Sequence, residues 1–401
     1  MSAPLYEQIV NWITTEIREK RLRPGDRVMS ERELAQHFGV STMTSKGALS
    51  RLAAQGLIVR LRGKGSFVAD VTSRGALVHK EEEEEEEVAA TAASERFDTD
   101  CLSANEGVTD RLIALIMPGF ADSFGAKVVR AAEDACATAG LHLLIRLTRG
   151  LREVEDQAID DCLRIGVSGI LVMPVHGEHY NTKILRLVLD GFPIVLLDRF
   201  LKGIPAQAVC TDNVLAGRDL TDFLFTKGHR RIAFLSPPLD TSSISDRLQG
   251  YQQAHTGRGY LASPKYVYTG VRSTMPIHET EQRDEMIDRE QRSLELFLQG
   301  IPEVTAYVAC EYEIALLAQR VLAKNGMHVP KDVSIVCFDT YHGVMDEVFF
   351  THVRQDEEAM GRLGVNLAVQ AMLGNATPLN VKIPHQIIES HSTREQISVS
   401  V

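Results

Sequence analysis

The stretch after Gly39 carries hydroxyls and a cation at a spacing that suits a phosphate backbone. Thr42 and Lys46 are four residues apart, so they share one face of the helix predicted there. Ser41 and Thr44 lie at the amino end of this helix, where free amides and hydroxyls can bind phosphate. Each side chain alone would be an ordinary solvated surface group. As a set they point to contact with DNA.

Two more cations lie on a predicted β-hairpin. Residues 57–62 alternate between two faces, residues 63–65 form a turn, and residues 66–68 can return as a second strand. Arg62 and Lys64 lie at the tip of this hairpin, within reach of phosphate or the minor groove. Together with the helix, they favour DNA contact over a solvated surface.

The elements that must position these groups form a helix-turn-helix. Ser30 and Glu33 have the spacing of a capping box, which satisfies free amides at a helix start. Gly39 lies where this helix would end in a left-handed turn. Ser41 then starts a second helix, which Gly56 ends. Two short helices joined by a tight, glycine-containing turn are typical of this motif, and a helix over residues 4–22 precedes them.

Residues 4–70 resemble the winged-helix domain of GntR-type transcription factors. The resemblance rests on residues 4–9, 22–26, 30–35, 38–41 and 63–68. It implies that Arg32, in the Ser-Glu-Arg-Glu block, contacts DNA. The family often carries arginine where this chain has Thr42 and Lys46, so the base sequence that it reads is not predicted.

A charge boundary separates this head from the rest of the chain. Residues 1–80 contain 13 Lys and Arg against 7 Asp and Glu, whereas the remainder contains 30 against 47. A basic small domain beside an acidic large one fits a nucleic-acid binder. Seven consecutive glutamates, Glu81 to Glu87, followed by small residues, predict a disordered linker over 71–109. The linker is either an acidic arm that competes with DNA or, as favoured here, a solvated spacer.

From residue 111 the pattern alternates between strands and helices. Apolar runs predict strands at 112–117, 141–147, 169–175, 193–197, 231–235, 266–270, 305–310 and 333–338. Helices are expected at 124–139, 153–165 and 214–227, while the charged segment 278–290 is expected to be a solvated loop. These elements predict two successive α/β units with parallel sheets and a cleft between them.

Residues 110–392 resemble the effector domain of the LacI/GalR family, which is similar to periplasmic sugar-binding proteins. The matching blocks are residues 197–199, 203–205, 211–213, 228–235, 245–251, 329–339 and 353–356. A GntR-type head on such a body resembles the arabinose-responsive repressors. The fold class expected is therefore α/β, with an N-terminal winged helix-turn-helix domain and a two-lobed periplasmic-binding-protein-like body.

The resemblance implies a ligand between the lobes, at the carboxyl ends of the strands. Asp122, Ser123, Phe124 and His176 follow strands there, and Phe124 would stack on a sugar face. Arg247 matches the family arginine that holds ligand hydroxyls in a fork of donors. Asp339 occupies the family's Phe-Asp position.

One departure from the family concerns Tyr312. The family often has Asn-Asp where this chain has Glu311 and Tyr312, so the usual acidic sugar ligand is replaced by Tyr312 or supplied by Glu311. Arg247 could instead bridge the lobes structurally. His176 and His179 form H-x-x-H in a loop without further ligands, so no metal is expected.

Composition limits the class of protein. The six cysteines form no C-x-x-C pair and are expected to be reduced in a cytoplasmic protein: Cys101, Cys136, Cys162, Cys210, Cys310 and Cys337. No apolar run reaches membrane-spanning length, and no signal core is expected at the N-terminus. No cofactor and no membrane partner are expected.

These patterns predict a ligand-responsive transcriptional regulator rather than an enzyme. Its domains would be 1–70 for DNA binding, 71–109 for the linker and 110–401 for effector binding and dimerisation. It would be a homodimeric repressor that a small sugar releases from operator DNA. The alternatives are a non-sugar effector such as a nucleoside, an activator, a sugar-binding module without DNA function and, more remotely, an enzyme with an aminotransferase-like body.

Overall fold

The computed structural model describes residues 9, 12–14, 16, 17, 22, 23, 25–40, 45, 48, 49, 52, 58–61, 65–68, 111–120, 123–175, 181–272, 282–341, 348–375, 377 and 379–396. The chain divides into two compact units, Met1–Ala89 and Ala90–Val401. The division falls inside the segment predicted to be a linker. None of the helices within these ranges is long and apolar enough to cross a membrane.

Helix α2 of the first unit, Glu31–Phe38, begins through the predicted capping box. The Ser30 Oγ accepts a hydrogen bond from the Glu33 amide at 3.3 Å, and the Glu33 carboxylate accepts one from the Ser30 amide at 2.6 Å. Gly39 ends the helix with a φ of 64°, a backbone region that glycine adopts at low cost. The prediction for this helix is confirmed.

The first unit also contains a small antiparallel sheet. Strands β2 (Ile58–Leu61) and β3 (Gly65–Val68) form the predicted hairpin. A third strand, β1 (Arg27–Val28), pairs with β3. Sequence analysis missed β1 because two residues cannot show an alternating pattern. The sheet shares one apolar core with the helical residues: Ile9, Ile13, Val28, Leu34, Ala48, Leu49, Leu52, Ile58 and Val68.

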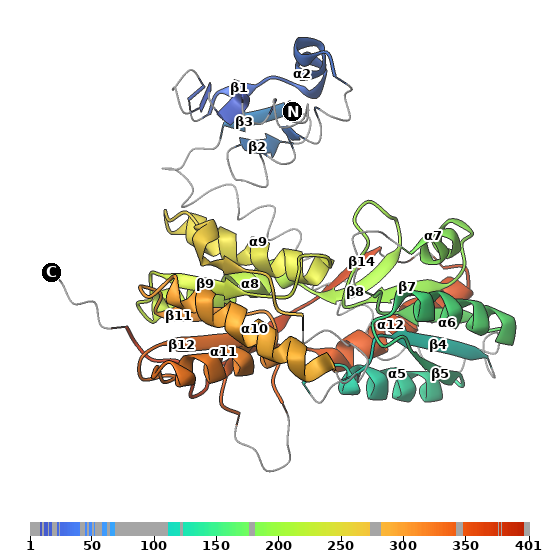
Figure 1. The fold of residues 1–401 in the computed structure, drawn as a ribbon. Helices are drawn as coiled ribbons and strands as arrows, with labels where there is room; N and C mark the ends of the chain where they lie inside the picture. Colours follow the sequence, from blue (N-terminus) through green and yellow to red (C-terminus); the bar gives the residue numbers. More distant parts are fainter. Residues whose placement is uncertain are drawn as a thin grey trace. The chain divides into compact units, whose positions relative to one another are not determined.

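The second unit contains two six-stranded sheets, each the centre of one lobe (Figure 1). The first-lobe sheet has the order β14-β8-β7-β6-β4-β5, with parallel pairing throughout. Its strands are β4 (Leu112–Met117), β5 (His142–Leu147), β6 (Gly169–Val172), β7 (Ile194–Leu197), β8 (Gln207–Thr211) and β14 (Asn380–Ile383). Its helices are α5 (Ala126–Thr138), α6 (Arg152–Ile165), α7 (Thr182–Leu189) and α12 (Glu357–Met372).

The second-lobe sheet has the order β10-β9-β11-β12-β13-β15. Its strands are β9 (Ile232–Leu235), β10 (Val267–Tyr268), β11 (Ala306–Ala309), β12 (Ser334–Phe338), β13 (Thr351–Gln355) and β15 (His385–Ile388). Its helices are α8 (Asn213–Thr226), α9 (Ser242–Gly257), the short 3-10 turn η2 (Pro264–Tyr266), α10 (Gln282–Gln299) and α11 (Tyr312–Lys324). Strand β15 runs antiparallel to β13, so the expectation of parallel sheets holds for every other pairing in this lobe.

Helices cover both faces of each sheet, which explains the continuous apolar runs of the strands. In the first lobe, α5 and α12 pack on one face, and α6 and α7 pack on the other. In the second lobe, α10 and α11 cover one face, and α8 and α9 cover the other (Figure 1). The cores therefore lie between sheet and helices, and the carboxyl ends of the strands remain for function.

Across the described elements the chain crosses between the lobes three times, which corrects the expectation of two successive units. It passes from β8 to α8 near Thr211, from β13 to α12 near Gln355, and from β14 to β15 near Pro384. Helix α12 returns to the first lobe because its apolar residues complete the core against α5. Strand β14 returns because it pairs with β8.

The charged segment predicted as a loop is also a correction. Residues 282–290 belong to α10, which extends to Gln299. Glutamate, glutamine and arginine are good helix formers, and the helix is anchored further along by Leu294 and Leu298 in the second-lobe core. The other predicted helices and strands of this unit match the structure within a few residues.

Candidate functional site

Arg247 lies in the second turn of α9, and its side chain makes several contacts within the second lobe. Its side chain is buried, and its Nε donates to the Asn213 Oδ1 at 2.8 Å. Its Nη1 donates to the Cys310 carbonyl at 2.6 Å. The guanidinium lies 3.9 Å above the centre of the Phe338 ring, a favourable cation–π geometry. Within the described part of the chain, Nη2 makes no hydrogen bond, so it is available to a ligand.

Asp339 follows β12 on the same side of the second lobe. Its φ is 64°, and both of its carboxylate oxygens accept from the Gln355 Nε2, at 2.9 and 3.0 Å. Burial raises the pKa of Asp339 to about 8; the charges of Glu357 and Asp198 raise it further, while Arg247 and the Gln355 bond oppose the shift. Although part of its surface is accessible, this carboxyl lies deep among protein atoms at the lobe boundary.

The first lobe contributes a second aspartate at the end of a strand. Asp198 follows β7 with a φ of 65°. The Arg199 Nε lies 3.3 Å from its carboxylate, and the Arg199 Nη1 donates to the Pro174 carbonyl at 2.6 Å. Asp198 and Asp339 therefore lie at corresponding places in the two sheets and approach each other closely enough to interact electrostatically.

Direct hydrogen bonds join the lobes around this cluster. The Ser123 hydroxyl donates to the Glu313 carboxylate at 2.7 Å. The Phe200 amide donates to the Ser242 hydroxyl at 2.9 Å. Ser123 and Phe200 belong to the first lobe, and Glu313 and Ser242 to the second. The contacts lie on opposite faces of the sheets, beside α5 and α11 in one case and α9 in the other.

The structure brings together some of the predicted effector residues but not all. Arg247 and Asp339 both lie at the lobe boundary, where the charge of Arg247 lowers the pKa of Asp339, but no hydrogen bond or ion pair joins them among the described residues. Phe124 packs on the first-lobe core. Tyr312 lies in an edge-to-face contact with Phe350, with ring centres 5.8 Å apart, and packs on the second-lobe core. Both aromatic rings therefore pack against the lobe cores.

Several predicted residues lie outside the described ranges. They are Ser41, Thr42, Thr44, Lys46, Arg62 and Lys64 of the head, and Asp122, His176 and His179 of the body. In the head, the described candidate is Arg32, which is exposed on α2, as a DNA contact requires. No group of three or more metal-ligating side chains occurs in the ranges that are described.

Sequence reasoning missed four polar residues of the cluster: Asn213, Glu313, Gln355 and Glu357. Asn213 and Gln355 lay within matching blocks, 211–213 and 353–356, but no pattern gave them a role. Their roles depend on the first and second crossings of the chain, which bring them to the lobe boundary. Glu313 directly follows Glu311 and Tyr312, where this chain differs from the Asn-Asp that is common in the family. That difference was the only signal that pointed to Glu313.

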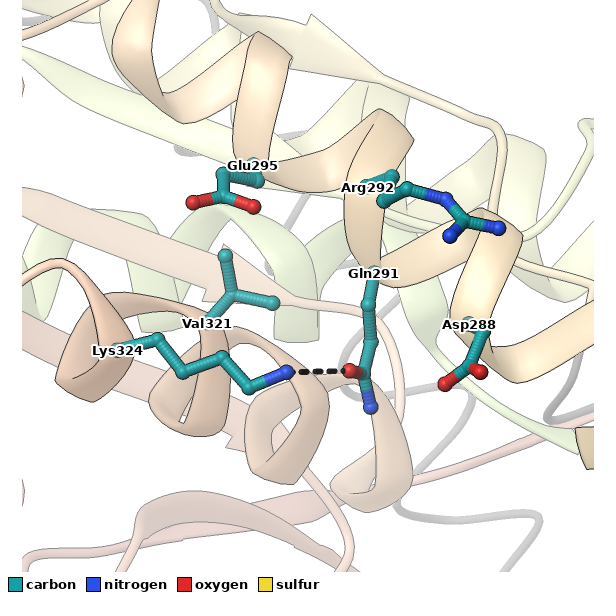
Figure 2. A pocket seen from close by; sticks show the side chains of 6 residues that line it. All are labelled: Asp288, Gln291, Arg292, Glu295, Val321 and Lys324. Atoms are coloured by element: carbon teal, nitrogen blue, oxygen red, sulfur yellow. Dashed lines mark hydrogen bonds between the residues drawn. The ribbon is translucent and has the colours of Figure 1, made fainter.

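A separate groove lies on the outer side of the second lobe, between α10 and α11 (Figure 2). Its volume is about 190 Å³, and the residues that line it are Asp288, Gln291, Arg292, Glu295, Val321 and Lys324. The Lys324 Nζ donates to the Gln291 Oε1 at 2.9 Å. The groove shares no residue with the Arg247 cluster, and its charges are of both signs.

The head and the body define a class of protein in which DNA contact and small-molecule binding reside in separate domains. Residues 5–68 match the bacterial regulatory proteins of the gntR family, and residues 221–393 match a periplasmic binding protein-like domain. The chain belongs to the helix-turn-helix transcriptional regulators, with a gntR-family head and a periplasmic-binding-protein-like body. It is a DNA-binding protein that regulates transcription.

Relatives and solved structures agree with this assignment. The chain is 24% identical to the arabinose metabolism transcriptional repressor of Geobacillus stearothermophilus over 370 residues, covering 91% of this chain and 89% of that protein. It is 30% identical to the transcriptional regulator CelR of Thermobifida fusca over 263 residues, covering 64% and 72%. Its fold is similar to that of a CelR–cellobiose complex, with a TM-score of 0.59 and 23% identity, covering 91% of this chain and 100% of that one. It also resembles CcpA of Lactococcus lactis, with a TM-score of 0.60 and 20% identity, covering 71% and 100%.

Proposed function

We propose that this regulator is a repressor that leaves its operator when a small sugar binds between the lobes. One observation carries the proposal: Arg247 has a guanidinium nitrogen without a hydrogen bond among the described residues, and its charge acts on the Asp339 carboxyl at the same lobe boundary. A fixed donor next to a fixed acceptor suits neighbouring hydroxyls of a sugar, which both donate and accept. The ring of Phe338 holds the guanidinium flat, so little entropy is lost when a ligand arrives.

The names of two relatives support a sugar effector. One relative is a repressor of arabinose metabolism, and one similar structure is a complex with cellobiose. We therefore take arabinose and cellobiose as the first probes, with a nucleoside as the non-sugar alternative. Binding, not catalysis, is the chemistry that this site supports, and the cytoplasm is the compartment in which it would act.

DNA recognition falls to the head. We propose that Arg32, with the hydroxyls and cations predicted at 41–46 and 62–64, contacts the operator, and that two heads of a dimer read a pseudo-palindromic site. Arg32→Ala should weaken operator binding and lower the slope of log affinity against log salt by about one unit. An unchanged affinity and slope would remove Arg32 from the interface.

The test of the whole proposal is operator affinity measured by fluorescence anisotropy, with each probe added in turn. A sugar should weaken binding of the full-length protein to DNA from its own upstream region. Tighter binding on adding sugar would make the sugar a corepressor, and a response to the nucleoside alone would replace the effector class.

The domain boundaries are tested separately. We propose a head at 1–70, a linker at 71–109 and a body at 110–401. Limited proteolysis should cut first within 71–109 and leave two folded fragments. Protection of that segment would show instead that it packs against one of the domains.

A further inference from the structure

The turn Gln355–Glu357 connects the lobes, and its three side chains each fix a different element. It lies where the chain leaves β13 of the second lobe and enters α12 of the first. The Gln355 amide nitrogen donates to Asp339, and its oxygen accepts from the Thr211 hydroxyl at 2.7 Å. Thr211 lies at the first crossing of the chain, and Gln355 lies at the second. Gln355 therefore connects both crossings to Asp339 through hydrogen bonds. Asp356 caps α12 by accepting from the Ala359 amide at 2.9 Å.

Glu357 reaches the amino end of α5. Its Oε2 accepts from the Gly125 amide at 2.6 Å, and the residue is 7% exposed. Gly125 precedes α5 and has no side chain to cap the helix, so Glu357 supplies the cap from a distant part of the chain. A carboxylate is favoured at this end of a helix by the helix dipole.

The segment that Glu357 holds also touches the opposite lobe. Two residues before Gly125, the Ser123 hydroxyl donates to Glu313. One end of the Gln355–Glu357 turn is therefore hydrogen-bonded to Asp339. The other end is hydrogen-bonded to the turn between β4 and α5, which itself contacts the second lobe. Both contacts are short hydrogen bonds to buried or half-buried carboxylates, from the Gln355 Nε2 to both oxygens of Asp339 and from the Gly125 amide to Glu357, and such bonds weaken steeply when they are stretched.

We propose that Gln355 and Glu357 are positioning residues that couple occupancy of the site at Asp339 to movement of the lobes. The coupling to a sugar rests on the proposed function, but the positioning of the lobes does not. When the lobes rotate about the crossings, Gln355 and Glu357 move with the hinge and must carry Asp339 and the Gly125 turn with them. A ligand that fixes Asp339 then favours one lobe arrangement, as allosteric coupling requires.

Electrostatics supports the same coupling. The charged groups that face Asp339 are Arg247 from α9, Glu357 from α12 and Asp198 from the end of β7. The pKa of Glu357 is itself raised, mainly by burial, while the Gly125 amide and Lys127 oppose this shift. The charge of Glu357 raises the pKa of Asp339, so a change in the position of Glu357 would change the ionisation of Asp339.

The experiment compares Glu357→Gln, Glu357→Leu and Gln355→Leu in the full-length chain. Spin labels are placed on Arg164→Cys in the first lobe and Leu261→Cys in the second, both highly exposed positions. Cys101 is replaced by serine, and five other cysteines are buried. Glu303→Gln, which removes the negative charge from a surface ion pair with Lys265 inside the second lobe, is the matched control.

Pulsed dipolar spectroscopy without sugar gives the first result. Glu357→Leu and Gln355→Leu should add a second inter-lobe distance, whereas Glu303→Gln should keep the wild-type distribution. Glu357→Gln should stay near wild type because its amide oxygen can still accept from Gly125. Wild-type distances in both leucine variants would overturn the positioning role whether or not any sugar binds.

Arabinose as the probe gives the second result. In the leucine variants, the sugar concentration at which half of the operator is released should rise about tenfold. The reason is that a smaller fraction of the protein has the lobe arrangement that binds sugar. In Glu357→Gln, the pH midpoint of the response should move to lower pH, because one charge that opposes ionisation of Asp339 is gone. If wild type ignores arabinose, the proposed effector fails, but the distance measurement still decides the positioning role.

Discussion

The two lobes share a backbone framework and differ in what they place on it. In each, an aspartate with a φ near 65° follows a strand: Asp198 after β7 and Asp339 after β12. In each, the next strand ends in an aspartate that caps a helix, Asp212 for α8 and Asp356 for α12. The geometry is repeated, although the two aspartates at the strand ends have different neighbours.

Packing of the paired helices is repeated as well. A Cβ on Gly217 of α8 would lie 2.4 Å from the Arg247 carbonyl oxygen in α9. A Cβ on Gly361 of α12 would lie 2.4 Å from the Val128 carbonyl oxygen in α5. In both lobes, the helix that enters from a crossing therefore touches its partner backbone to backbone, which only glycine permits.

The polar groups available to a ligand belong mainly to the second lobe. Arg247, its partners Asn213 and Cys310, and the ring of Phe338 all belong to the second lobe, whereas Arg199 in the first lobe pairs with Asp198 and a carbonyl. This asymmetry is why we propose that the second lobe supplies most of the polar contacts to the ligand. Variants in corresponding positions should therefore differ in their effect on sugar affinity and agree in their effect on folding.

The largest difference should come from the two arginines. Arg247→Lys keeps a charge but loses the fork of donors, so sugar affinity should fall roughly ten- to a hundredfold. Arg199→Lys should change it less than threefold. Calorimetric titration with arabinose measures both, and operator binding without sugar confirms that the head is intact. Equal losses in the two variants would show that the grip is shared between the lobes.

The two helix contacts should respond alike. Gly217→Ala and Gly361→Ala each force helices apart and should lower the free energy of unfolding by about 1–3 kcal/mol. Urea unfolding of the full-length variants measures the change, and Gly257→Ala, with open space around its Cβ, is the control. A large cost at one glycine and none at the other would refute the shared framework.

The pH dependence of stability should reveal the raised pKa of Asp339 in the second lobe. Because the pKa of Asp339 is raised to about 8, folding favours its neutral form, and stability falls as pH rises from about 4 through 8. Asp339→Asn removes this fall and should be more stable than wild type at pH 9, at the expense of sugar binding. Thermal unfolding at pH 6 and pH 9 decides the matter.

A smaller effect of opposite sign should come from His229 in the second lobe. Burial lowers its pKa to about 4, and its ring bonds Thr305, Ser334 and the Arg394 carbonyl. The neutral ring is favoured in the fold, so stability is present above about pH 6.5 and is lost as pH falls toward 4. His229→Gln should flatten the decline between pH 6.5 and 4.5 in thermal unfolding. A decline as steep as in wild type would place its origin elsewhere.

The sequence predicted the elements well where local chemistry determines them. The capping box at Ser30 and the apolar runs of β4 and β12 can be recognised from local sequence alone. It failed for β1, which exists because β3 provides a partner, and for the early part of α10, whose charges resemble a loop.

The candidate site also contains residues that the sequence predicted and residues that it did not. Arg247 and Asp339 were predicted because each lies in a block whose family role is known. Gln355 and Glu357 were not, because their partners are 16 and 232 residues away in the chain. Only the crossings of the chain bring them together, and no local pattern encodes a crossing.

The central claim is that Arg247 and Asp339 bind the effector that releases DNA. The most direct measurement is operator affinity of wild type and Asp339→Asn as arabinose is titrated, followed by fluorescence anisotropy at pH 8.5. Both proteins should bind the operator equally without sugar, and only wild type should release it at low sugar concentration. Release of the operator from Asp339→Asn at the wild-type sugar concentration would contradict the account, because the effector would then bind without this carboxylate.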